Sequence, residues 1–148
     1  MVQGYGVRMT SLAVKDAIRE AWDALIPELP RFDIINTAPK ASTLPSVWAG
    51  LLFDDAPLEP VSIGAGTACW REIGTCTAII MTQSGSGDAT PGELALLVRQ
   101  RLFKWSGLQG FLQIVAVHPP KDGLDEDPPK RTYFQTYVEL DYVYEVYQ

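Results

Sequence analysis

The side chains best suited to covalent chemistry are one histidine and two cysteines, His118, Cys69 and Cys76. A thiol beside an imidazole can form a nucleophile–base pair, yet nothing in the sequence brings His118 near either cysteine. One histidine and two cysteines at this spacing match no zinc-binding pattern. Seven extended residues would separate the two thiols by roughly 23 Å, far beyond the ~7 Å Cα separation that a disulfide requires. We therefore expect no catalytic pair, no metal and no cofactor, and two reduced cysteines.

A glycine-rich turn at residues 85–90 lies between a strand pattern and a helix pattern, where phosphate-binding loops occur. Its details argue against that use. Thr90 stands where a dinucleotide-binding loop needs glycine, and Asp88 would repel phosphate. We interpret the segment as a turn that leads into a capped helix.

Four carboxylates fall within strand patterns, at Glu72, Glu139, Asp141 and Glu145. Paired carboxylates can act as general acid and base. On strands of alternating character, they more simply mark the side of a sheet that meets solvent or another subunit. We adopt that second interpretation and expect no enzymatic activity.

Two segments have the apolar spacing of amphipathic helices. In residues 12–26, apolar side chains recur at three- and four-residue steps, after Thr10 and Ser11 as candidate N-cap hydroxyls. Pro27 then ends the pattern.

The second helix is predicted at residues 91–105. Thr90, Pro91 and Glu93 form a capping box with proline at the first helical position. Leu96 and Phe103 lie off the apolar stripe of this helix, seven residues apart. They belong either at the edge of the core or in a subunit contact.

The remaining patterns predict strands with one covered face and one more exposed face. The predicted strands are residues 31–36, 47–53, 69–81 (interrupted at Gly74), 111–117 and 132–147. The order is therefore α-β-β-β-α-β-β. It predicts a single α+β domain over residues 1–148, in which two helices pack on one face of a mostly antiparallel sheet.

Two long connections are rich in proline. Residues 54–66 are interpreted as a loop. Residues 119–130 are acidic and are bracketed by proline pairs, which prevents continuous strand pairing because proline lacks a donor. We expect these residues to form either a projecting arm between the last two strands or a solvated loop, and long loops are often functional.

The charge balance limits the classes of partner. Twelve Lys and Arg stand against 18 Asp and Glu, giving a formal net charge of −6. Tight binding of nucleic acid needs a clustered basic surface, so we do not expect it. No apolar run approaches the ~20 residues of a membrane-spanning helix, and no membrane association is expected.

Taken in order, these elements resemble the tail terminator (tail completion) proteins of long-tailed bacteriophages, the family that includes the lambda tail terminator. The likeness covers most of the chain and is one of layout, without a strict signature motif. It is carried by the opening helix and the short strand Phe32-Asp33-Ile34-Ile35-Asn36, by Arg71-Glu72-Ile73-Gly74, by the turn Gly85-Ser86-Gly87, and by the closing strand Tyr133-Phe134-Gln135-Thr136-Tyr137-Val138-Glu139-Leu140-Asp141-Tyr142.

The resemblance implies a structural protein of the virion. Subunits of this family form a hexameric ring at the head-proximal end of the tail tube, end its polymerisation, and take part in head–tail joining at the neck. The implied partners are the tail-tube protein on one face and the head-connector or neck protein on the other. DNA would pass through without specific binding. The implied location is the tail-neck region of the virion, and the host cytoplasm during virus assembly.

An acidic channel lining would repel DNA phosphates at close range. The candidate lumen or partner contacts are Asp88, Asp122, Asp125, Glu126 and Asp127, and the candidate subunit contacts are Leu96 and Phe103. The long insert at residues 54–66 and the double-proline arm depart from the family layout and leave the neck role open. The alternatives are another neck component (a head-closure or adaptor protein, or a tail-tube subunit) and, less favoured, a monomeric small-ligand-binding domain.

Overall fold

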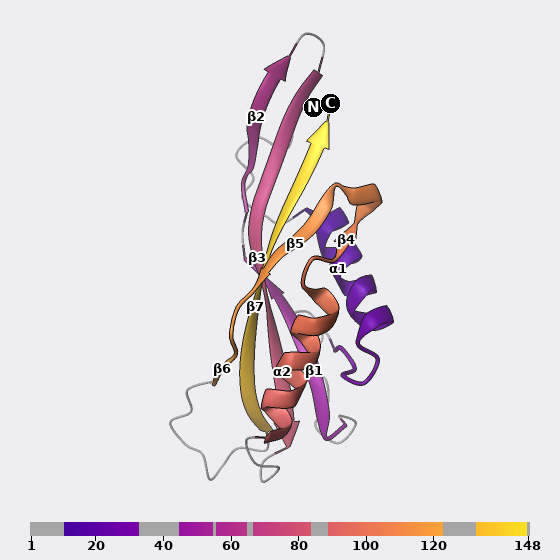
Figure 1. Cartoon of the computed structure of the whole chain (residues 1–148), viewed down its shortest axis with the longest axis vertical. Coiled ribbons are helices and arrows are strands. Elements are labelled where there is room, and N and C mark those ends of the chain that lie inside the picture. Colours follow the sequence, from indigo (N-terminus) through magenta and orange to yellow (C-terminus); the bar gives the residue numbers. More distant parts are fainter. Residues whose placement is uncertain are drawn as a thin grey trace.

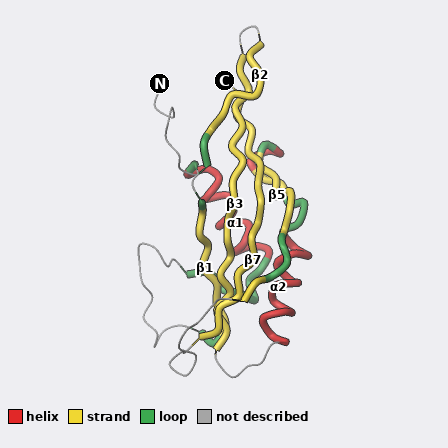
Figure 2. The backbone as a smooth tube through the Cα atoms, turned by 90° about the vertical axis from the view of Figure 1, so that its left-hand side faces the viewer, coloured by secondary structure: helices red, strands yellow, loops and turns green. Residues whose placement is uncertain are grey.

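Two helices cover one face of a curled, antiparallel sheet in the computed structural model (Figure 1). The structure describes residues 11–32, 45–54, 56–64, 67–83, 89–122 and 133–147. Figure 2 looks onto the face of the sheet that the helices leave uncovered. None of the helices in these ranges has the length and apolar character needed to cross a membrane.

The sheet is built around two long strands that pair along nearly their whole length. Its strands are β1 (Val47–Phe53), β2 (Leu58–Gly64), β3 (Thr67–Gln83), β4 (Ser106–Gly107), β5 (Leu112–Val117), β6 (Lys121–Asp122) and β7 (Tyr133–Tyr147). The order is β1-β3-β7-β5-β4, with β2 also paired to β3 and β6 to β7. Strands β3 and β7 keep one register from Cys69–Tyr147 to Gln83–Tyr133.

The helices pack only against one end of these strands. Strand β2 and the neighbouring ends of β3 and β7 project beyond the helices (Figure 1). We call this part of the sheet, β2 with residues 67–71 of β3 and 145–147 of β7, the extension. No described helix covers it, so it relies on strand pairing.

Helix α1 (Leu12–Leu25) is held by its apolar stripe. Val14, Ile18 and Trp22 are fully buried against the sheet. The indole of Trp22 also donates to the carbonyl of Leu29 over 2.9 Å, which holds the chain after the helix in place. A buried indole needs such a partner, because an unpaired buried donor is costly.

Helix α2 (Ala89–Leu102) lies beside α1 and is joined to its end by one side chain. The guanidinium of Arg101 donates to the carbonyl of Leu25 over 2.8 Å and to both carboxylate oxygens of Glu28 over 2.6 and 2.7 Å. These hydrogen bonds lower the pKa of the Glu28 carboxyl and raise the pKa of Arg101. The orphan carbonyl at the end of α1 is thereby satisfied.

The predicted fold class is confirmed, and the order α-β-β-β-α-β-β holds for the longer strands. The strand predicted at residues 31–36 lies mostly outside the described residues. Among residues 31–36, the structure describes only an isolated parallel bridge from Arg31 to Ala49 and the residue after it. Residues 54–66, predicted as a loop, instead contain β2. Pro60 is tolerated there because β2 pairs with β3 alone among the described strands, and prolines are accepted on such edges.

The first helix begins at Leu12 as predicted, with Ser11 at its N-cap position, whereas the second begins two residues earlier than predicted. The Ser11 side chain makes no capping hydrogen bond. Helix α2 begins at Ala89, so Thr90 lies inside the helix and cannot cap it. Strand β3 is not interrupted at Gly74. The two cysteines lie on this one strand and form no disulfide.

Candidate functional site

The uncovered side of the sheet carries most of its charged side chains. Along β7, Val138, Leu140 and Tyr142 are buried toward the helices, while Glu139, Asp141, Val143 and Glu145 alternate with them and are partly exposed. We call this side, with the side chains in register on β3 and β5, the open face. The positions of Glu139, Asp141 and Glu145 agree with the prediction that these carboxylates lie on the exposed side of the sheet.

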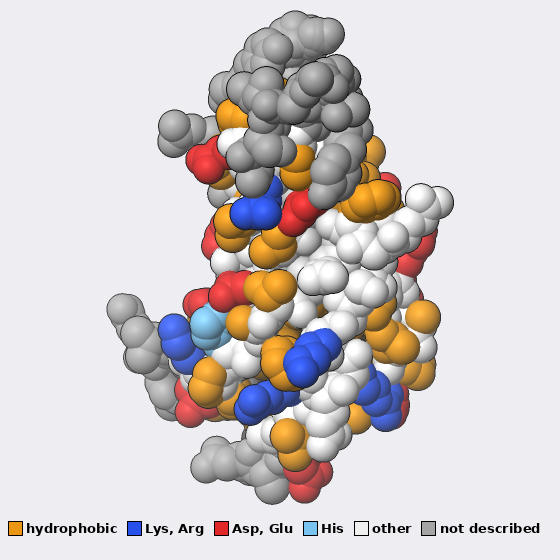
Figure 3. Space-filling model, turned by 45° about the horizontal axis from the view of Figure 1, so that its top comes forward, with side chains coloured by type: hydrophobic (Ala, Val, Ile, Leu, Met, Phe, Trp, Pro, Cys, Tyr) orange, Lys and Arg blue, Asp and Glu red, His pale blue; other side chains and the backbone are white. Residues whose placement is uncertain are grey.

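A hydrogen-bonded polar cluster of the open face is centred on Asp141. Its Oδ2 lies 2.6 Å from His118 Nε2, and its Oδ1 accepts a hydrogen bond from the Thr75 hydroxyl over 3.1 Å. Three neighbouring strands thus contribute to it, because Thr75 and Asp141 are register partners and His118 follows β5. In Figure 3 the histidine lies at the surface between acidic and basic side chains.

A second charged group lies toward the extension. Arg71 and Glu145 face each other across β3 and β7 and form an ion pair of 3.1 Å. The other Glu145 oxygen lies 3.7 Å from the Cys69 thiol. Glu59 is the register partner of Arg71 on β2 and adds a further carboxylate to this group.

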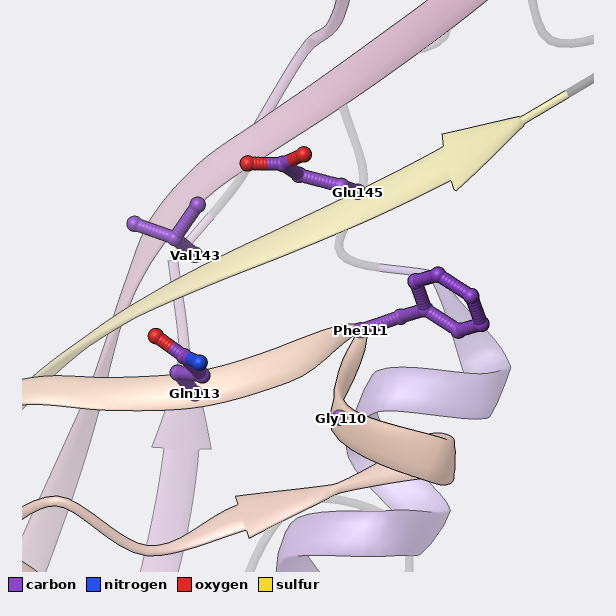
Figure 4. A pocket seen from close by; sticks show the side chains of 5 residues that line it. All are labelled: Gly110, Phe111, Gln113, Val143 and Glu145. Atoms are coloured by element: carbon purple, nitrogen blue, oxygen red, sulfur yellow. The ribbon is translucent and has the colours of Figure 1, made fainter.

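A hollow of about 300 Å³ opens beside this group. Gly110, Phe111, Gln113, Val143 and Glu145 line it, and Figure 4 shows the side chains of Gln113, Val143 and Glu145 rising from β5 and β7. Gly110, with a φ of +91°, ends the turn that places Phe111 at the rim. The hollow therefore combines an aromatic ring, an aliphatic side chain and a carboxylate.

The prediction of an exposed position was wrong for Glu72. This carboxylate is 2% exposed and lies on the helix side of β3. It accepts a hydrogen bond from the Tyr142 hydroxyl over 2.6 Å and contacts the Ser11 amide at 3.3 Å. The ring of Tyr142 reaches it by crossing Gly74, where a Cβ would overlap the ring and hydroxyl. Glu72 is thus paired within the fold and lies beside the start of α1, where the helix dipole favours negative charge.

The structure does not bring His118 and the cysteines together. Cys76 is fully buried, and burial raises the pKa of its thiol, which keeps it protonated and poorly nucleophilic. Cys69 contacts Glu145, whereas His118 contacts Asp141, four residues away on the same strand. Within the described residues, no group of three or more histidine, cysteine, aspartate or glutamate side chains is arranged to hold a metal.

The predicted contact residues are only partly placed. Asp88, Asp125, Glu126 and Asp127 lie outside the described residues. Asp122 is exposed on β6 and lines a shallow pocket beside the start of α2. The first part of the predicted arm at residues 119–130 therefore joins the sheet through Lys121 and Asp122, and residues 123–130 lie outside the described part.

Leu96 and Phe103 lie on the outer side of α2 and just beyond its end, 54% and 41% exposed. Of the two predicted locations for them, the core edge and a subunit contact, the observed exposure leaves both side chains accessible to a partner. The sequence signal that distinguished them was their position off the apolar stripe.

Comparisons with known proteins bear on the fold. No family model and no curated protein matches the chain. Nine chains of solved structures match it. One of them, known only by a serial designation, superposes with a TM-score of 0.53 at 13% sequence identity, covering 90% of this chain and 97% of the other. At this level of identity, the match supports the α+β fold and says nothing about function.

Proposed function

We propose that this chain is a structural virion protein of the tail terminator type. Copies of it would form a ring, hexameric as in the family it resembles, on the head-proximal end of a phage tail tube. The ring would end tube polymerisation and join the tail to the head connector. The proposal rests on the sequence resemblance together with the surfaces described above.

The observation that supports it best is the extension. Even a sheet of three strands needs a packed apolar face for stability, and strands without one need another surface. Here β2 and the ends of β3 and β7 project past the helices, with the exposed Ile73 at their base. Such an uncovered segment is well suited to contact with a second protein.

The charge fits a channel that lets DNA pass. The formal net charge is −6, and the described carboxylates include exposed Asp122 and partly exposed Glu139. A negative lining keeps phosphate groups from sticking, because like charges repel at close range. The partners in this proposal are the tail-tube protein on one side of the ring and a neck protein on the other.

The test is a tail-assembly assay combined with a mass measurement. Purified protein added to growing tail tubes should cap them, and tubes grown without it should overrun in length or fail to join heads. Light scattering should give the mass of one closed ring at assembly concentrations. Tube length and head joining that are indifferent to the protein would contradict the proposal.

Other outcomes distinguish the alternatives. Open stacks of the protein alone would identify a tail-tube subunit. Binding to heads without any effect on tube length would identify a head-closure or adaptor protein. A stable monomer that binds a metabolite would favour the small-ligand-binding domain, for which the hollow beside Phe111 is one candidate site.

A further inference from the structure

The outer side of α2 and the residue pair after it form a cationic, aromatic projection. Leu96, Arg99, Phe103 and Lys104 are all exposed there, turned away from the buried face of the helix. The Arg99 guanidinium lies 6.0 Å from the centre of the Phe103 ring, and the Lys104 ammonium lies 5.5 Å from it. These cation–π contacts hold the ring between two positive charges. We call these four residues the α2 knob.

The open face has the opposite character. Its described carboxylates are Glu59, Glu139, Asp141 and Glu145, against the cations Arg71 and Lys121. The face also holds the hollow of about 300 Å³ with Phe111 and Val143 in its wall. It therefore offers a hollow of mixed lining, with Phe111 and Val143 beside Gln113 and Glu145, on the side of the sheet that the helices do not cover (Figure 2).

We propose that copies of this chain associate head to tail, with the α2 knob of one copy against the open face of the next. Phe103 enters the hollow between Phe111 and Val143. Arg99 and Lys104 then lie near Glu145, the carboxylate that lines the hollow. This inference deepens the proposed function and rests on its self-assembly, and it names the two surfaces that make the contact.

Charge complementarity selects a second copy in this orientation. In a two-fold contact between knobs, Arg99 and Lys104 would face the same cations of the other copy. In a contact between two open faces, carboxylates would face carboxylates. Like charges brought together in this way disfavour association. A head-to-tail contact pairs opposite charges. It also leaves one knob and one open face unused at the ends of every chain of subunits, as ring closure requires.

Two variants, each damaging one of the surfaces, test the contact. Phe103→Glu removes the ring of the knob and lowers its net positive charge, while Gln113→Lys places a cation at the edge of the hollow. Each variant alone should weaken self-association about thirtyfold or more, as loss of a central interface residue does. Leu12→Ser, at an exposed position of α1 outside both surfaces, is the matched control and should assemble like the original chain.

Mixing the two variants gives the decisive measurement. The Phe103→Glu chain keeps its open face and the Gln113→Lys chain keeps its knob, so one intact contact can form between them. Light scattering of the 1:1 mixture should give a dimer, twice the 16.3 kDa mass of the chain, while each variant alone stays monomeric. Circular dichroism melting of each variant checks that it is folded, and Arg99→Glu serves as a second knob variant on an exposed position.

The outcomes separate this inference from the function. If the original chain forms a ring and the variants assemble equally well, or if their mixture stays monomeric, the head-to-tail contact is overturned while the proposed function stands. If the original chain stays monomeric at all concentrations and does not cap tubes, the proposed function fails and this inference fails with it.

Discussion

Strand β3 carries two isoleucines seven residues apart whose surroundings differ completely. Ile80 is fully buried under the helices, whereas Ile73 is 61% exposed on the open face. Both positions pair with β7, and Ile80 pairs with β1 as well. The difference is made by what covers the strand. The covered side stabilises the fold, and Ile73 on the open side is accessible to another molecule.

The sharpest test of this contrast is one truncation on each side. Ile80→Ala should lower the free energy of unfolding by about 2–5 kcal/mol, since it leaves a cavity in a closed core. Ile73→Ala should change it by no more than about 0.5 kcal/mol. Denaturant unfolding at low protein concentration measures both. Equal losses would mean that the open face is packed within the monomer.

The next largest expected loss of stability comes from a substitution at Gly74, which the Tyr142 ring crosses. Gly74→Ala places a methyl group inside the Tyr142 ring and would separate its hydroxyl from buried Glu72. We expect a loss of about 3 kcal/mol, from overpacking and an unpaired buried carboxylate.

Gly92→Ala is the control for that change, because a Cβ at Gly92 meets nothing within 4 Å. Alanine is the better helix former there, so thermal unfolding should show a gain of about 0.5–1 kcal/mol. A loss at Gly92 as large as that at Gly74 would show that the clash with Tyr142 is not the cause.

Removal of one hydroxyl compares the two faces directly on β7. Tyr142→Phe deletes the donor to buried Glu72 and should cost about 1–3 kcal/mol. Tyr137→Phe deletes a hydroxyl that donates to Gln135 from a partly exposed position, and should cost less than about 0.5 kcal/mol. Chemical denaturation of both variants at neutral pH decides whether the Glu72 pair matters as argued.

The smallest expected effect on stability comes from the surface ion pair between Glu28 and Arg101. Because hydrogen bonds from Arg101 lower the pKa of Glu28 from 4.5, the pair stabilises the folded chain above the unfolded pKa. That contribution is lost as pH falls through the lowered folded value. Glu28→Gln should therefore melt slightly earlier than the original chain at pH 7 and equally at pH 2–3. A difference that persists in acid would point to lost packing of the side chain.

The helices and the two long strands were readable because their signals are local. The three- and four-residue apolar steps of α1 and the alternation of β7 each arise from one element packing one side against a core. The exposed positions of Leu96 and Phe103 followed from the same periodicity. Strand β2 was missed because Pro60 resembles a loop signal, and only its pairing with β3 makes it an edge strand.

The residues of the candidate surfaces were harder to predict than the helices and long strands, because their positions depend on tertiary structure. The sequence treated Glu72 like the other strand carboxylates, and only the crossing of Tyr142 over Gly74 buries it. Likewise, His118 and Asp141 are 23 residues apart and meet because β5 and β7 pair, with a register shift just before Ala116.

The sequence by itself determined the fold class, the acidic charge and which helix positions lie off the core, since composition and periodicity follow from local burial. Only the tertiary structure decided which side of the sheet stays open, where the hollow lies and how far the extension projects. Those features depend on strand register and on helix placement, which are set by contacts between residues far apart in the chain.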